Sequence, residues 1–239
     1  MCNYDKTKLN NKCWVFNEEI IDIFPEMLQR SIPGYSIIIS IITMLLNYFV
    51  TNDTYIYDMG CSLGEVTLSI NKKIKARNCE IIAIDKSEAM INSLKKKLVG
   101  LKLNAKINII EDNICNVPIK NASMVILNFT LQFLSLHEQK NILQSIYTGL
   151  NSGGVLILSE KFKFSNSFFN KIICNLHHDF KKNNGYSEKE IVEKKSMLKK
   201  VMLIDTIENH KKKLIEIGFN HIELLFQYLN FGSLLAIKK

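Results

Sequence analysis

The feature that most constrains the fold is an alternation between short apolar runs and helical patterns across residues 55–159. The apolar runs are rich in β-branched and aromatic residues and occupy 55–58, 81–85, 107–110, 124–128 and 155–159. Between them, Met90, Ile91 and Leu94 share one helical face behind a capping Ser87, and a capping-box spacing begins at Ser135. Continuous apolar strands separated by helices predict a parallel sheet covered on both faces.

The C-terminal part of the chain departs from this alternation. Capping patterns at 187–190 and 205–208 predict two more helices, and Gly218 ends the second. Two apolar runs follow at 222–229 and 231–237, separated only by Asn230. So short a connection requires antiparallel pairing, here at the sheet edge. A seven-stranded, mostly parallel sheet that ends in an antiparallel hairpin, with helices on both faces, resembles the Rossmann-like class I S-adenosylmethionine (SAM) methyltransferase fold.

The whole chain, 1–239, is predicted to form one α/β domain. It has 239 residues, of which 47% are apolar, and no Pro, Gly or Ser-rich linker interrupts it. We expect an N-terminal helical extension over about 1–50 and a helical insertion over about 163–203. The most apolar segment, 36–50, is interrupted by polar residues and is shorter than the roughly 20 residues of a membrane span. It predicts a buried core helix, and no membrane association is expected.

Cysteine usage and charge indicate the cellular compartment and the classes of ligand. The six cysteines form no CxxC pair and no zinc spacing, and residues 1–14 are polar without an export-type apolar region. These observations predict reduced thiols, a cytoplasmic protein and no metal site. The net charge of +8 comes almost entirely from scattered lysines, with only two arginines. Because a nucleic-acid groove favours interleaved aromatic residues and arginines, direct tRNA binding is not expected.

Polar and glycine residues at the ends of the first two strands predict a nucleoside site. Asp58, Gly60 and Gly64 form a D-x-G-x-x-x-G pattern where the first strand meets the next helix. The glycines allow a ligand close to the backbone, while the amides of the helix start face it. Neither G-x-G-x-x-G nor a P-loop lysine is present. The second strand ends in Asp85, whose carboxylate is able to accept both ribose hydroxyls.

The next two strands end in residues suited to the rest of an adenosyl amino acid. Asn113 offers an acceptor for the adenine amino group and Ile114 an apolar face, although Asn113 is equally well read as a loop cap. Asn128 offers an amide to the zwitterionic end of an amino acid. Because the carboxyl ends of parallel strands meet at one edge, we expect these side chains to surround bound SAM.

Four segments outside this constellation indicate a particular family. Residues 24–35, 127–133, 177–187 and 230–233 resemble the carboxy-S-adenosyl-L-methionine synthases, and the likeness runs from about residue 14 to the C-terminus. The resemblance implies conversion of SAM and prephenate to carboxy-SAM and phenylpyruvate. It also implies a homodimer, with the Lys195 region reaching the neighbouring subunit. The product would pass to a tRNA carboxymethyltransferase that forms 5-oxyacetyl-uridine at the wobble position.

The resemblance implies roles for ten residues. Tyr35 would cover the cofactor, and Gly60, Cys61 and Ser62 would line its amino-acid and ribose side. Asp85 and Lys86 would hold the ribose region, while Asn113 and Ile114 would frame adenine. Asn128 would lie near the reacting end, and Lys195 would bind the added carboxylate. The family has aspartate at the position of Asn113 and arginine at that of Lys195. Lysine keeps the charge without the bidentate fork, and asparagine keeps an acceptor oxygen.

Other interpretations of the sequence remain open. An ordinary class I methyltransferase acting on a small molecule or RNA would share the SAM-binding residues, and so would a non-catalytic SAM-binding module. No general base is evident, so we expect catalysis by positioning and electrostatics. The adjacent His177 and His178 point in different directions on a helix, which favours packing or capping over metal binding.

Overall fold

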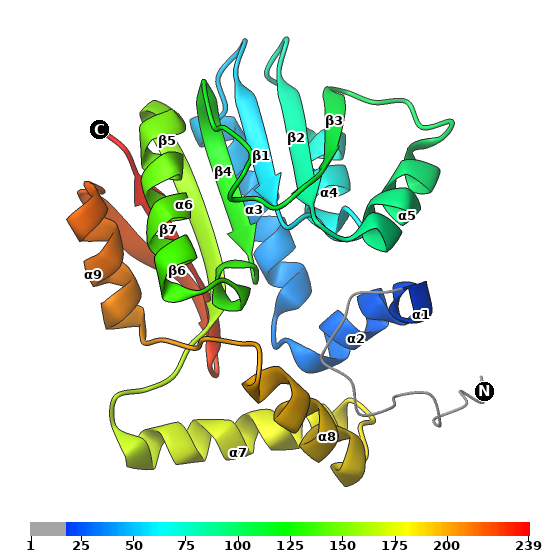
Figure 1. Cartoon of the computed structure of the whole chain (residues 1–239), viewed down its shortest axis with the longest axis vertical. Helices are drawn as coiled ribbons and strands as arrows, with labels where there is room; N and C mark the ends of the chain where they lie inside the picture. The colour runs from blue at the N-terminus through cyan, green and yellow to red at the C-terminus, as the bar shows by residue number, and fades with distance from the viewer. Residues whose placement is uncertain (1–17) are drawn as a thin grey trace.

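The computed structural model describes residues 18–239, which build one seven-stranded mixed sheet between helices (Figure 1). The sheet has the order β3-β2-β1-β4-β5-β7-β6. Its strands are β1 (Tyr55–Met59), β2 (Glu80–Asp85), β3 (Lys106–Glu111), β4 (Ala122–Asn128), β5 (Leu150–Lys161), β6 (His221–Tyr228) and β7 (Phe231–Ile237). Strands β1 to β5 pair in parallel, and β7 is antiparallel to both of its neighbours. The predicted fold class is therefore confirmed, while the predictions for Cys2, Cys13 and the polar start of the chain lie outside the described residues.

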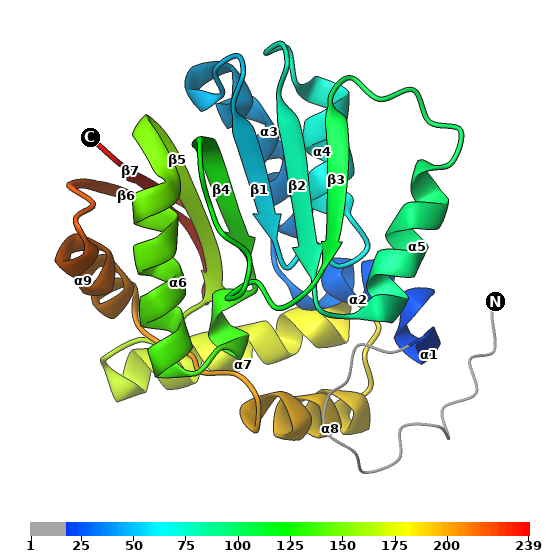
Figure 2. The same cartoon turned by 45° about the horizontal axis from the view of Figure 1, so that its top comes forward.

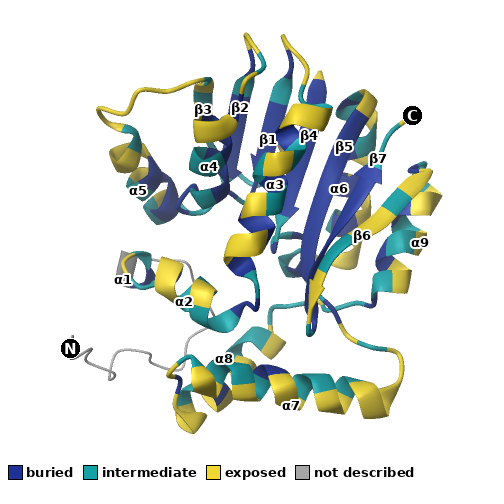
Figure 3. Cartoon of the chain, turned by 180° about the vertical axis from the view of Figure 1, so that it is seen from behind, coloured by how far each residue is buried: buried dark blue, intermediate teal, exposed yellow. Residues whose placement is uncertain are grey.

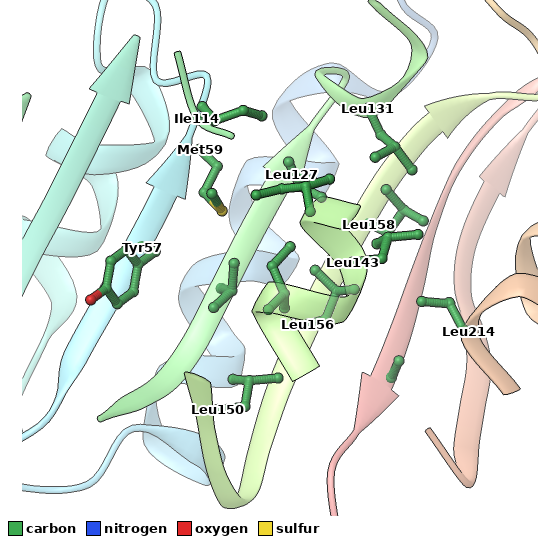
Figure 4. Packing of buried hydrophobic residues seen from close by; sticks show 14 of the residues in the cluster. Tyr57, Met59, Ile114, Leu127, Leu131, Leu143, Leu150, Leu156, Leu158 and Leu214 are labelled. Atoms are coloured by element: carbon green, nitrogen blue, oxygen red, sulfur yellow. The ribbon is translucent and has the colours of Figure 1, made fainter. Parts of the chain in front are cut away.

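Helices cover both faces of the sheet. On one face lie α3 (Tyr35–Phe49), α4 (Glu65–Lys73) and α5 (Glu88–Leu98), and on the other lie α6 (Leu136–Gly149) and α9 (Ile207–Ile217). Alternate residues of each central strand enter opposite cores, so that Ile126 packs towards α3 and Leu127 towards α6. Figure 4 shows the second core, where Leu127, Leu156 and Leu158 meet Leu143 of α6. These two cores fix the strand ends that carry the candidate site.

The helix starts follow the sequence signals. Ser87 accepts a hydrogen bond from the Met90 amide at the start of α5. Reciprocal capping boxes begin α6 at Ser135 and the helix α8 (Glu188–Lys199) at Ser187. These predicted caps are confirmed, because each satisfies amides that the first helical turn leaves unpaired.

Four further helices lie across the carboxyl ends of the parallel strands. They are α1 (Glu18–Ile21), α2 (Phe24–Ser31), α7 (Ser167–Asn183) and α8, and Figures 1 and 2 both show them below the sheet. The His177 ring of α7 is 2.9 Å from the Ser31 carbonyl of α2, which joins the two segments. The short 3-10 helix η2 (Leu131–Phe133) follows β4 at the same edge. Ligand sites of open α/β sheets occur at this edge.

Two strand boundaries differ from the sequence expectation. Strand β5 runs from Leu150 to Lys161, and Gly153 and Gly154 lie inside it because their backbones bond to Lys238. Strand β6 ends at Tyr228, because Leu229 adopts a left-handed φ of 55° and joins Asn230 in the turn. The hairpin connection therefore has two residues instead of one.

The apolar segment at 36–50 forms α3, whose Ile38, Ile42 and Leu46 are buried. Within residues 18–239, no single helix has both the length and the apolar character to cross a membrane. Helices α2 and α3 satisfy that test only as a pair bent by 98°. Figure 3 shows the buried sheet beside the more exposed β6 and α7.

Candidate active site

The turn after β1 is fixed to the end of β2. The amides of Gly60 and Cys61 both donate to the Ile84 carbonyl, at 2.8 and 2.9 Å. Gly60 has a φ of +86°, and a Cβ at this position would collide with the Thr130 hydroxyl. Only glycine fits this turn comfortably, so the backbone itself forms this side of the site.

Asp85 is an acceptor whose two carboxylate oxygens are both held by backbone amides. Its Oδ2 accepts from the Ser62 amide and its Oδ1 from the Ser87 amide, each at 2.9 Å. Burial raises the pKa of Asp85, while these amides and the exposed Lys86 act against that rise. Each carboxylate oxygen can accept a further hydrogen bond, as binding of a ribose diol requires.

Two motif residues serve the fold. The Thr67 amide and hydroxyl of α4 donate to Asp58 Oδ2 at 3.0 and 2.6 Å, which ties β1 to the following helix. Burial raises the pKa of Asp58 to about 6. Cys61 is also buried, and burial raises the pKa of its thiol, so it is not a reactive nucleophile.

Tyr35 begins α3 and is only 5% exposed. Its hydroxyl bonds to Glu65, the first residue of α4, and its ring lies 6.3 Å from that of Phe129. Burial is the main reason that the pKa of Tyr35 is raised, with the charges of Glu65 and Asp58 adding to it. Tyr35 is therefore an uncharged side chain beside the glycine turn.

The loop after β3 contains both predicted adenine residues. Asn113 Oδ1 accepts from the Cys115 amide at 3.0 Å, so the side chain caps its own loop, the alternative that the sequence left open. Ile114 is 6% exposed and packs in the core beside Met59 at the end of β1 (Figure 4). The carbonyl oxygen of Asn113 keeps a second lone pair for a ligand donor.

Asn128 has a buried side-chain oxygen at this edge that suits a ligand donor. It ends β4, and its side-chain Oδ1 is buried without a hydrogen-bond partner among the described residues. Buried polar atoms in native proteins are almost always paired. A ligand donor such as the ammonium group of an amino acid satisfies this oxygen, so the residues present fit SAM.

Lys195 lies apart from the glycine turn, on the helix α8. It is exposed, and its charge lowers the pKa of Lys161 at the end of β5 and of Lys181 on α7. The structure therefore brings Lys195 into a lysine cluster, defined as Lys161, Lys181, Lys194 and Lys195, below the carboxyl edge of the sheet.

Comparisons with known proteins identify the family. Residues 56–154 match the model of a methyltransferase domain. The carboxy-S-adenosyl-L-methionine synthase of Photorhabdus laumondii is 52% identical over 94% of this chain and 89% of its own length. The synthase of Escherichia coli strain UMN026 is 52% identical over 94% of this chain and 91% of its own. The chain belongs to the carboxy-S-adenosyl-L-methionine synthase family.

Solved structures show the same fold. Human N-acetylserotonin methyltransferase in complex with SAM has a TM-score of 0.59 and 13% identity, over 92% of this chain and 55% of that chain. The cyclopropane synthase MmaA2 of Mycobacterium tuberculosis has a TM-score of 0.58 and 11% identity, over 78% of this chain and 63% of that chain. These structures share the fold of the chain.

The adjacent His177 and His178 have two separate sets of contacts. His177 packs on Phe231 at 4.9 Å between ring centroids and reaches the Ser31 carbonyl, whereas His178 Nε2 lies 2.9 Å from Glu188. Burial lowers the pKa of His177 to about 3, so it is neutral. No group of three or more metal-ligating side chains occurs within residues 18–239.

Sequence reasoning missed Lys161 and Lys181. Lys161 follows the predicted fifth strand by two residues and would have been found by placing that strand's end correctly. Lys181 lies within the segment 177–187 that carried the family resemblance, but its position on a helix gives no local sign of a site. Only the packing of α7 and α8 below the sheet brings these lysines together (Figure 2).

Proposed function

We propose that this enzyme converts SAM and prephenate into carboxy-SAM, phenylpyruvate and water. The observation that carries the proposal is that the chain combines two features. The carboxyl edge of the sheet, from Gly60 to Asn128, has residues suited to SAM, and the lysine cluster that includes Lys195 lies below this edge. A methyltransferase has no need of cations beside the reacting methyl group, whereas a growing carboxylate does. The family membership supports the same reaction.

The reaction balances without a further reagent. Prephenate loses its ring carboxylate as carbon dioxide, and the electron pair of the broken bond enters the ring and expels the ring hydroxyl as hydroxide. When bound, SAM supplies a methyl group that its sulfonium charge acidifies; hydroxide removes a proton from it, and the C–H electron pair bonds to carbon dioxide. The hydroxide becomes water, and the phenylpyruvate ring is aromatic.

The protein's part is to hold both substrates and keep carbon dioxide inside. Asp85 binds the ribose hydroxyls, Asn128 the amino-acid end and Lys195 the new carboxylate. Helices α2, α7 and α8 lie across the carboxyl edge of the sheet (Figures 1 and 2), and we propose that they limit the entry of water there. Lys195 forms a point contact where arginine would form two parallel hydrogen bonds.

We also propose that the enzyme is a cytoplasmic homodimer whose product passes to a tRNA carboxymethyltransferase. Helix α7 supports the dimer, because Phe168, Phe169 and Leu176 are 68%, 56% and 46% exposed. Large exposed apolar side chains in one patch are typical of an interface. Sedimentation velocity tests this part: a dimer is expected, and Phe169→Asp should convert it to monomer.

Incubation with prephenate and SAM tests the activity. The expected product is a nucleoside heavier than SAM by the mass of carbon dioxide, together with phenylpyruvate. Transfer of the methyl group to an acceptor, with S-adenosylhomocysteine as product, would instead show an ordinary methyltransferase. Tight SAM binding without any turnover would show a non-catalytic module.

A further inference from the structure

The lysine cluster contains two residues to which nothing so far gives a role, Lys161 and Lys181. Lys161 is the last residue of β5, and Ser159 of the same strand pairs with Asn128 in the adjacent strand. Lys161 Nζ lies 5.6 Å from the centroid of the Phe231 ring. That ring lies 5.9 Å from Phe129, the residue after Asn128. The contacts of Phe231 with Lys161 and Phe129 therefore connect Lys161 to the end of the SAM site where Asn128 lies.

Lys161, Lys194 and Lys195 repel Lys181, and none of the four lysines has an acidic partner in the described part of the chain. Lys194 is engaged otherwise, since it donates to the Tyr186 hydroxyl at 2.9 Å. Burial lowers the pKa of Lys161, the Cys174 thiol acts against that shift, and the charge of Lys195 adds to it. Burial and the charges of Lys161, Lys194 and Lys195 lower the pKa of Lys181 to about 8.

The carboxylate next in sequence does not pair with Lys161. Glu160 projects to the opposite face of β5, where its Oε2 accepts from the Gln132 amide at 3.1 Å. Burial raises the pKa of Glu160, and the Gln132 and Leu131 amides together with the charge of Lys213 act against that rise. His177, in contact with Phe231, is neutral. The positive charge of Lys161 and Lys181 is therefore uncompensated by the described side chains around it.

Partly buried, unpaired cations cost stability, and a folded protein gains from them only when a ligand brings the missing charge. We propose that Lys161 and Lys181 bind the carboxylate of the donor's pyruvyl side chain. This inference rests on the proposed function, because it names the donor site of that reaction. The ligand class is a small carboxylate that carries a six-membered ring.

The chemistry determines which donor carboxylate the lysines hold. Prephenate has two, and the ring carboxylate loses its charge as carbon dioxide forms. A cation paired with that group would stabilise the ground state more than the transition state and slow the reaction. The pyruvyl carboxylate keeps its charge throughout, so cations there bind the donor without raising the barrier. Phenylpyruvate retains that carboxylate and must bind to the same lysines.

The test is the binding of phenylpyruvate by calorimetry to the full-length enzyme, with SAM binding measured in parallel. Lys161→Met and Lys181→Met should each weaken phenylpyruvate binding about tenfold or more and leave SAM binding within about twofold. Lys182→Met is the matched control, because Lys182 neighbours Lys181 but lies 3.5 Å from Glu188. It removes one charge and should leave phenylpyruvate binding unchanged.

A stability measurement separates a binding role from a structural one. Removal of an unpaired, partly buried cation should leave the melting temperature of the ligand-free enzyme unchanged or higher, whereas loss of a structural lysine would lower it. Lys181→Arg keeps the charge and should retain phenylpyruvate binding. A variant that fails to fold therefore contradicts the proposal.

The outcomes distinguish this inference from the proposed function. If carboxy-SAM forms but both methionine variants bind phenylpyruvate normally, the lysine site is wrong and the reaction stands. If phenylpyruvate binding depends on both lysines but no carboxy-SAM forms, the carboxylate site stands and the reaction is wrong. If Lys161→Met and Lys181→Met weaken phenylpyruvate binding only as much as Lys182→Met does, the lysines act through long-range charge attraction alone. That result would overturn the inference.

Discussion

The two halves of the candidate site are built in different ways. The SAM edge from Gly60 to Asp85 is held by backbone hydrogen bonds, with both amides of the glycine turn on Ile84 and two further amides on Asp85. The lysine cluster has no such support, and its members come from β5, α7 and α8. One half is rigid before any ligand arrives, whereas the other contains charges that a ligand must balance. Substitutions should therefore damage the first half through its backbone and the second through its charge.

The largest effect is expected for Gly60→Ala, which tests the rigidity of the SAM edge. A positive φ and a Cβ against Thr130 together should lower the free energy of unfolding by about 3 kcal/mol and abolish SAM binding. Chemical denaturation and calorimetry measure the two effects. Combining it with Thr130→Ala removes the two closest contacts and should restore part of the stability. A Gly60→Ala enzyme with normal stability and SAM affinity would show that this turn adapts.

Asp85→Ala should weaken SAM binding by about 1.5–3 kcal/mol, the range for hydrogen bonds to a charged group. The ribose loses its acceptor, and the amides of Ser62 and Ser87 lose theirs. Asp53→Ala is a suitable control, because Asp53 precedes β1 at the opposite edge of the sheet and its carboxylate accepts from the Asn78 side chain. Equal losses of SAM affinity for the two variants in calorimetry would remove the special role of Asp85.

The same contrast explains what the sequence could and could not predict. Asp58, Gly60 and Asp85 lie at strand ends and mark the first half of the site, because strand periodicity and glycine turns are local properties. Even there, tertiary contacts decided details, such as the Asn113 oxygen that caps its own loop. Lys161 lay beyond the predicted end of its strand, which continues because β7 pairs with it as far as Phe231. Lys181 became a candidate only through the packing of two distant helices.

Lys195→Ala tests whether the second half acts through charge. Lys195 is exposed, so its loss should weaken carboxy-SAM binding by only about 1 kcal/mol and SAM binding by less. Lys195→Arg should strengthen carboxy-SAM binding, because its guanidinium pairs with a carboxylate through two hydrogen bonds. Lys199→Ala on the same exposed helix face is the control. Equal losses of both ligands in Lys195→Ala would mean that Lys195 supports the fold instead.

The last expected effect is a dependence on pH. The pKa of Lys181 is about 8, lowered by burial, by Lys161 on β5 and by Lys194 and Lys195 on α8; His177 on its own helix is neutral. Because a carboxylate binds the protonated lysine, phenylpyruvate affinity should be constant below pH 8. Above pH 8 it should fall, by about tenfold at most per pH unit for one proton. In Lys181→Arg this decline should move to higher pH, since the guanidinium stays charged. An unchanged profile in that variant would assign the titration to Lys161, and a flat wild-type profile up to pH 10 would show that neither lysine binds the carboxylate.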